Sequence, residues 1–356
     1  SGALLVDAQS DDVIGAYVGQ AAGASTAAAG LSVLVNESSG KTEAAVSGST
    51  LTETGESENK LTTEGAVADS AVNDEVANDV SISGTLEDDR GQRTVSGMLV
   101  SATGTTTFKS LVLNGAGAGT GAGTGTVSVT YLGGTTKTEV TGSTLNAKDA
   151  LDIFAAHYAN VDNISTTAAG AGTGAGAIAV NVATTERAVS AALDGGSLAS
   201  EGDVSIKAEG KEGVSSLALI GAGAGTGAGV VLANVTRELS DVSVDVARTN
   251  ATTINAQSLA IAGDYLGRYN ALGVSGAGSG AAAGAVNVNV NYGDNDVGVS
   301  VGKLSAAVSE KAEIEARRRT ENSGIAVNAS GSQYAAVSAT VLVNTVEGAA
   351  RTEING

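Results

Sequence analysis

The chain has 356 residues, and 19 Lys and Arg against 38 Asp and Glu give it a net charge of −19. This acidic balance excludes binding to nucleic acid or anionic membranes through broad electrostatic attraction, and the absence of cysteine excludes disulfides and Cys-based zinc sites. Aromatic residues make up 3% of the chain and apolar residues 42%, which is too apolar for a disordered chain and predicts a core of small side chains.

Residues 1–51 contain the first elements of a repeat. A glycine and alanine track, GASTAAAGLSVLVN, ends at Asn36, and the strand-like segment KTEAAVSGS follows at 41–49. Val6 lies 30 residues before Asn36, a spacing that the last unit repeats. We interpret 1–51 as an incomplete first unit of a solenoid.

Residues 52–93 interrupt this regularity. About 39 extra residues lie here compared with a later unit, and the segment contains 11 acidic and 3 basic residues. Thr62 and Thr63 are candidate helix caps before valines spaced by four, so a small helical or hairpin excursion is predicted. Insertions in solenoids form loops that often bind partners, and a solvated acidic loop is the alternative. The acidic run Glu87, Asp88 and Asp89 is a candidate for calcium ligation through oxygen atoms.

Residues 94–356 are predicted to continue the solenoid and to end within an incomplete unit. Their first track, GAGAGTGAGTGTVSVT, has Thr130 in the position that asparagine takes elsewhere. Residues 146–158 have apolar residues at helical spacing, but the equivalent segment at 202–210, GDVSIKAEG, alternates as a strand does. Consistency between units therefore predicts strands at 150–156 and at 311–317. His157, the only histidine, is interpreted as an exposed turn residue.

The later units repeat at a nearly constant spacing. The track asparagines are 53, 55 and 55 residues apart and a second strand-like element repeats at 53, 55 and 53, the residues being Asn181, Asn234, Asn289 and Asn344, and Ile153, Ile206, Ile261 and Ile314. Periods of this length indicate one supersecondary unit stacked on its neighbours. The absence of proline is typical of an array in which nearly every strand is central. The sequence therefore predicts an all-β parallel solenoid.

A unit of about 53 residues exceeds one coil of short strands, so two or three coils per unit are expected. Stacked strands are about 4.8 Å apart, so equivalent asparagines would then be roughly 10 to 14 Å apart and unable to form a direct side-chain ladder. Under this interpretation the asparagines, Asn36 included, are structural and satisfy backbone groups at corners.

The glycine tracks have three interpretations. A phosphate-binding loop needs a strand, a tight turn and a helix N-terminus, and the tracks show only the glycines. Silk-like stacking of flat sheets is a second interpretation. The third, which we favour, is tight packing of one solenoid wall against the opposite wall through glycine and alanine.

Few residues point to chemistry. Asp294 and Asp296 in YGDNDVG are a second candidate set for calcium, but neither acidic group has EF-hand spacing, and no other cofactor is expected. Arg317, Arg318 and Arg319 form the one positive run, interpreted as an exposed corner, with a contact to heparin-like chains or to the acidic insertion as the alternative. A lone histidine and scattered aromatic residues do not indicate a catalytic triad or a sugar-binding cleft, so no enzyme activity is predicted.

The repeats GAGTGAGAIAVNV at 170–182, KTEVTGSTL at 137–145 and EGDVSIKAE at 201–209 resemble those of the leukotoxin-type filamentous adhesins. These are large surface exoproteins of Gram-negative bacteria, related to filamentous haemagglutinins. The resemblance covers most of the chain outside 52–93. It implies a right-handed parallel β-helix that is exported by a type V pathway, commonly two-partner secretion.

This resemblance implies a structural or binding segment of an extracellular or cell-surface adhesin that presents a rod-like β-helix. The implied partners are a host-cell receptor or glycan, and an outer-membrane transporter during export, with no insertion into a membrane. Two alternatives stay open. One is a β-helix enzyme acting on acidic polysaccharide, and the other is a cytotoxic, leukotoxin-like exoprotein.

Overall fold

The computed structural model describes residues 3–54, 61–63, 93–95 and 97–355, and in these residues it contains β-strands and turns but no helix. The all-β prediction is therefore confirmed. All described pairings in the main sheet are parallel. Both predicted strands at 150–156 and 311–317 lie within longer strands, β8 (Ala150–Ala171) and β16 (Leu304–Gly331). The helical spacing at 146–158 does not produce a helix, because residues 151–158 pair one by one with the strands of the neighbouring coils.

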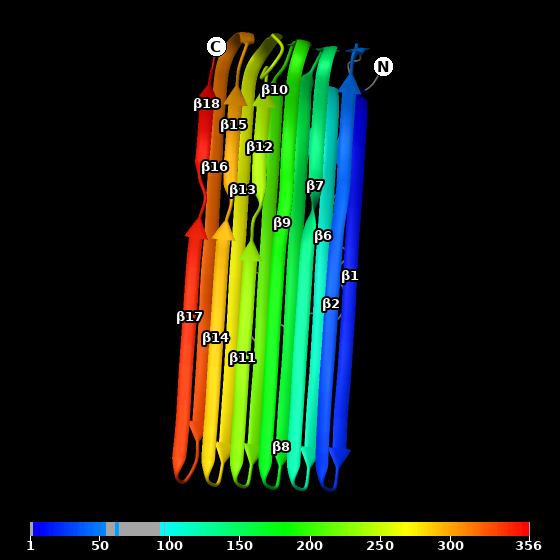
Figure 1. Cartoon of the computed structure of the whole chain (residues 1–356). Coiled ribbons are helices and arrows are strands. Elements are labelled where there is room, and N and C mark those ends of the chain that lie inside the picture. The colour runs from blue at the N-terminus through cyan, green and yellow to red at the C-terminus, as the bar shows by residue number, and fades with distance from the viewer. Residues whose placement is uncertain (1–2, 55–60, 64–92, 96, 356) are drawn as a thin grey trace.

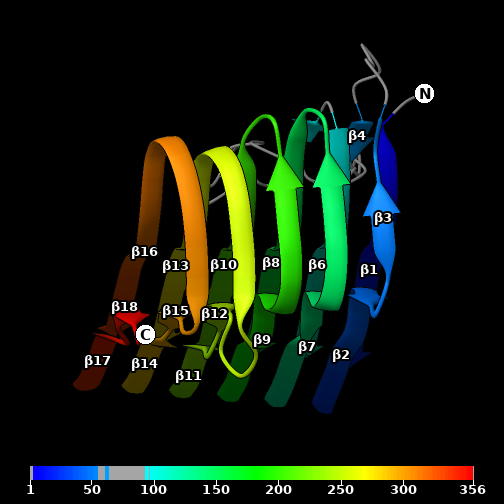
Figure 2. The same ribbon diagram turned by 90° about the horizontal axis from the view of Figure 1, so that it is seen from above.

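The long strands form two layers that face each other (Figures 1 and 2). Layer A contains β1 (Leu4–Ala24), β6 (Gly97–Ala118), β8, β10 (Val204–Ala224), β13 (Thr252–Ser279) and β16. Layer B contains β2 (Ala27–Ser47), β7 (Gly121–Ala147), β9 (Gly174–Ser200), β11 (Gly227–Glu238), β14 (Ala282–Asp294) and β17 (Ala335–Glu347). Short strands β3 (Thr50–Thr52), β12 (Asp241–Val246), β15 (Asp296–Val301) and β18 (Ala350–Ile354) complete the coils.

Each repeat unit is a single turn of the solenoid. Ile206 in β10 pairs directly with Ile153 in β8 and with Ile261 in β13. The expectation of two or three coils per unit is therefore wrong. That expectation assumed short strands, whereas β7 and β13 have 27 and 28 residues. Two long strands and one short connecting strand or bend therefore account for all the residues of a unit.

The coils make a slab in which the strands are longer than the stack of coils is high (Figure 1). At about 4.8 Å per strand, the described coils stack to about 29 Å along the solenoid axis. At about 3.3 Å per residue, a strand of 25 residues measures about 80 Å across that axis. The broad faces of the two layers therefore form most of the surface.

The two ends of each coil differ. At the narrow end, two-residue turns such as Gly225 and Thr226 join layer A to layer B, and a core of inward alanines lies beside them. At the wide end, the chain bends at residues with positive φ, including Gly134, Gly142 and Ala247. Valine, isoleucine and leucine from all walls fill that end.

The first coil contains the segment predicted as an insertion. Val6 pairs with Val100, which is 94 residues later, whereas later coils repeat at 53 to 55. Within the segment, β4 (Leu61–Thr63) and β5 (Arg93–Val95) form a separate antiparallel pair. The predicted excursion after Thr62 and Thr63, and the acidic run Glu87, Asp88 and Asp89, fall mainly or wholly outside the described residues.

Among the described residues there is no helix with the length and apolar character needed to cross a membrane.

Candidate functional site

The predicted asparagines lie within layer B strands, where Asn36, Asn181, Asn234 and Asn289 are buried and Asn344, in the last coil, is exposed. Asn234 is fully buried and pairs in register with Asn181 on one side and Asn289 on the other. The prediction that asparagines lie at corners is wrong, because Asn181, Asn234 and Asn289 lie within the strands β9, β11 and β14. The predicted separation of roughly 10 to 14 Å between equivalent asparagines is also wrong, because one unit is one coil and the asparagines lie on neighbouring strands. Their side chains nevertheless bond to the opposite layer rather than to each other, since the amides of Asn181 and Asn234 donate to the carbonyl oxygens of Leu217 and Ser216. In the next row the Asn291 amide donates a 3.0 Å hydrogen bond to Oδ1 of Asn344.

The asparagines belong to two rows rather than one. Asn36 pairs with Thr130, in a row that also contains Asn291 and Asn344. Asn289, by contrast, pairs with Leu342. Paired residues of the last two coils are 53 positions apart in the sequence. Asn289 and Asn344 are 55 positions apart, so they belong to different rows.

The interior near these rows is polar and bonds across the two layers. Ser216 in layer A donates a 2.6 Å hydrogen bond to Oδ1 of Asn234, whose amide nitrogen lies 3.3 Å from the Ser216 carbonyl oxygen. One coil earlier, the amide of Asn181 donates to the carbonyl oxygen of Leu217 at 3.4 Å. Buried amides and hydroxyls thus fix the relative positions of the layers.

His157 is buried, contrary to the interpretation as an exposed turn residue. It lies in a strand and points inward with 2% of its surface exposed. The Nη1 atom of Arg187 is 3.3 Å from its Nδ1, and Thr106 Oγ1 is 3.5 Å from its Nε2. Burial, and next the charge of Arg187, hold the pKa of His157 well below its usual value of 6.5, so the ring is neutral. Burial also lowers the pKa of Arg187 to about 10.

Two buried carboxyl groups lie deeper along the same interior. Glu212 accepts a 2.7 Å hydrogen bond from Ser240, and burial raises its pKa. Glu238 accepts a 2.7 Å hydrogen bond from the amide of Asn295 and another from the Tyr265 hydroxyl. Burial, and next the neighbouring Glu212, raise the pKa of Glu238 well above its usual range. Burial therefore favours the protonated form of Glu238, whereas the charge of Arg187 favours the ionised form of Glu212.

Sequence reasoning missed this group, although strand alternation contained the signal. Once Ile153 is placed in the core, every second residue of the strand points inward, and His157 is the second such position after it. By the same alternation, Glu212 is the third inward position after Ile206, and Glu238 is the second after Asn234. Charged residue types are rarely buried, which is why composition alone assigned them to the surface.

A groove of about 610 Å³ on the outer surface brings four acidic side chains together: Glu186, Asp241, Asp294 and Asp296. Burial, and next the charge of Asp296, raise the pKa of Asp241. Asp294 and Asp296 thus lie near further carboxylates, but no group of three or more His, Cys, Asp or Glu in the described part of the chain is arranged to hold a metal ion. Arg187 also lines the groove, but the carboxylates outnumber it, which makes the groove suited to a basic partner.

The positive run lies within strand β16, not at a corner. Arg317 and Arg319 point outward and form ion pairs with Glu315 and Glu321, at 2.7 and 2.5 Å. Arg318 donates to the carbonyl oxygen of Glu347 instead. Strand alternation separates the three guanidinium groups, so they do not form one basic patch.

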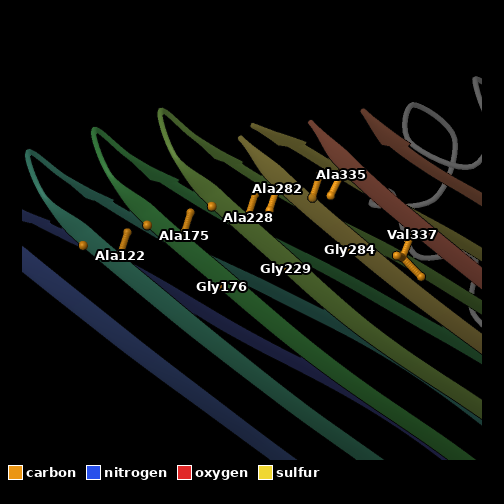
Figure 3. A pocket seen from close by; sticks show the side chains of 13 residues that line it. Ala122, Ala175, Gly176, Ala228, Gly229, Ala282, Gly284, Ala335 and Val337 are labelled. Atoms are coloured by element: carbon orange, nitrogen blue, oxygen red, sulfur yellow. The ribbon is translucent and has the colours of Figure 1, made fainter. Parts of the chain in front are cut away.

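The glycine tracks line a second, apolar groove of about 740 Å³ on the outside of layer B. Figure 3 shows it crossing successive strands, with Gly176, Gly229 and Gly284 in one row. A Cβ atom on any of these three glycines would meet nothing within 4 Å. The prediction that the walls pack through glycine and alanine is therefore right for the alanines, which face inward between the layers. It is wrong for these glycines, which face outward.

The comparisons with protein-family models, curated proteins and solved structures find no match to this chain.

Proposed function

We propose that this chain is a structural and binding segment of a bacterial filamentous adhesin, located at the cell surface or secreted. The observation that supports it most is the single-coil repeat, in which the inward residues build the stack and outward residues of layer B, such as Val231, are exposed for contact with partners. Solenoids of this kind use their extended faces for binding. The proposal includes a host-cell receptor or glycan as partner and export by a type V pathway through an outer-membrane transporter.

The finer features of the fold are part of the proposal. We take the winding to be right-handed, because crossover connections between parallel strands are right-handed in about 98% of cases. The units of 53 to 55 residues are taken as one coil each. At about 4.8 Å per coil, about 17 coils are needed before the stack is longer than the strand length of about 80 Å and the solenoid becomes a rod.

The alternative of an enzyme acting on acidic polysaccharide has less support. The ionisable residues that the fold gathers, His157, Arg187 and Glu212, are at most 4% exposed and lie between the layers, where a polysaccharide cannot reach them. The outer groove is itself acidic and repels a polyanion. No particular contact favours the cytotoxic alternative.

The test is binding of the purified fragment to host cells and to a glycan array. Three proteins are compared: the fragment, a version with 52–93 replaced by a short flexible linker, and the triple variant Asp241→Asn, Asp294→Asn and Asp296→Asn. We expect saturable binding by the fragment and loss of binding in one variant, which locates the surface. Absence of saturable binding, or release of reducing ends from an acidic polysaccharide, would contradict the proposal.

A further inference from the structure

Ionisable residues are absent from one end of every coil. The layer B segments 27–36, 121–130, 174–183, 227–236, 282–291 and 335–344 contain no Asp, Glu, Lys or Arg. These segments are paired side by side in the structure. In a chain of net charge −19, all the charges of layer B therefore lie toward the wide end.

The outer surface of these segments is entirely aliphatic. On β11 the outward residues are Gly227, Gly229, Val231, Ala233 and Val235, and the other five strands place only Gly, Ala, Val, Leu or Ile at the equivalent positions. We name these outward positions the aliphatic face. Polar side chains such as Asn234 point inward instead, so the polarity of this region is the reverse of that of an ordinary two-layer fold.

The aliphatic face has the size of a stable protein interface. Ten residues at about 3.3 Å by six strands at about 4.8 Å give a flat area of about 950 Å². Stable interfaces bury about 800 Å² on each partner, and exposed apolar patches of this size mark interaction sites. Figure 1 shows the strands side by side with little twist, so a flat partner can cover all of them.

We propose that the aliphatic face is a self-association surface on which a second copy of this chain docks face to face. A two-fold axis along the solenoid direction, through the row of Val231, brings each half of the face against the other half of the partner's face. The half nearer the turns is the glycine groove, and the other half consists mainly of valines such as Val235. Valines of one copy then fill the glycine groove of the other.

Charge favours this antiparallel arrangement. The two-fold axis directs the wide, charged ends of the two copies away from each other, so the net charge of −19 on each chain opposes the contact only weakly. Exposed side chains at the centre of the face become buried, including Ile178, Val231 and Val286, which are 53%, 44% and 37% exposed in one copy. This inference does not depend on the proposed adhesin function.

The test is sedimentation velocity of the purified protein across a wide range of concentration. We expect a reversible dimer of this chain. Gly229→Val projects into the groove, and a Cβ atom at that position would meet nothing within 4 Å. It should weaken the dimer about ten- to hundredfold. Val231→Lys should abolish dimerisation by burying an unpaired charge.

Gly223→Val is the matched control. Gly223 is two residues before the turn glycine Gly225, on the outer surface of layer A, and it also has nothing within 4 Å. This variant should dimerise like the parent, with unchanged circular dichroism in all proteins. The proposal is overturned if the parent is monomeric at every concentration, if Gly223→Val disrupts the dimer and Gly229→Val does not, or if the assemblies are end-to-end filaments insensitive to both.

Discussion

The backbone N–H of Gly225 donates a 3.1 Å hydrogen bond to the carbonyl oxygen of Gly172, one coil earlier, and a Cβ atom on Gly225 would lie 2.1 Å from that oxygen. A Cβ atom on Gly172 would likewise lie 2.1 Å from the carbonyl oxygen of Gly119, and one on Gly280 would lie 2.3 Å from that of Gly225. The turn glycines are therefore required by the close stacking of the turns. The outward glycines of the same tracks have no such constraint.

We expect Gly225→Ala to lower the free energy of unfolding by about 1 to 3 kcal/mol, because the turns must separate to admit the methyl group. Gly223→Ala, two residues away, should be neutral or slightly stabilising, since its Cβ has open space and alanine reduces the entropy of the unfolded chain. Thermal denaturation of both variants checks this. Equal losses in the two variants would contradict the distinction between turn glycines and outward glycines.

The pair Ser216 and Asn234 should be energetically coupled. Asn234→Ala leaves the buried Ser216 hydroxyl without its acceptor, which costs about 1 to 3 kcal/mol. Ser216→Ala should therefore destabilise the Asn234→Ala variant less than it destabilises the parent. In a double-mutant cycle the coupling energy between the two residues should be at least about 0.5 kcal/mol. Asn36→Ala combined with Asn234→Ala, several coils apart, should be additive. An additive result for the Ser216 pair would show that the cross-layer bond contributes nothing.

Glu238 should make the protein less stable as pH rises. Its pKa is raised on folding, so its contribution is complete below the unfolded value of about 4.5 and is lost as pH rises through the folded value. Glu238→Gln should flatten this dependence, which has a limiting slope of about 1.4 kcal/mol per pH unit. Urea denaturation at several pH values between 5 and 9 measures it.

Glu209 is the control for that experiment. Burial alone would raise its pKa, but Lys207 and Lys211 lower it, so its contribution is present above about 4.5 and is lost only in acid. Glu209→Gln should therefore reduce stability by a similar amount at each pH between 5 and 9. A parent and a Glu238→Gln variant with the same pH slope would refute the buried, protonated carboxyl.

His157 should act in the opposite direction. Its pKa is lowered on folding, so its contribution is complete above the unfolded value of 6.5 and is lost as pH falls toward the folded value. In His157→Gln, whose side-chain oxygen can still accept from Arg187, the loss of stability on acidification should be smaller by up to about 1.4 kcal/mol per pH unit. Direct titration of the ring by NMR is an independent measurement, and a ring pKa near 6.5 would contradict this prediction.

The candidate site was predictable only in part. Asp294 and Asp296 stand out in the sequence, but Asp241 and Glu186 reach the same groove from earlier coils, and only the register between coils shows this. The inward direction of His157 follows from strand alternation, but its partner Arg187 comes from the opposite layer. Contacts between layers depend on where the chain turns, and no local pattern encodes that.

The sequence by itself determined the repeat, the strand character of 150–156 and the in-register rows of Ile153, Ile206 and Ile261, because identical units can bury their apolar residues only by stacking in register. Tertiary structure decided that one unit is one coil, that Asn234 lies between layers and that Gly229 lies outside. Strand alternation tells only that two neighbours point to opposite sides. Which side is the interior depends on the layer that packs there, and that layer comes from a different part of the coil.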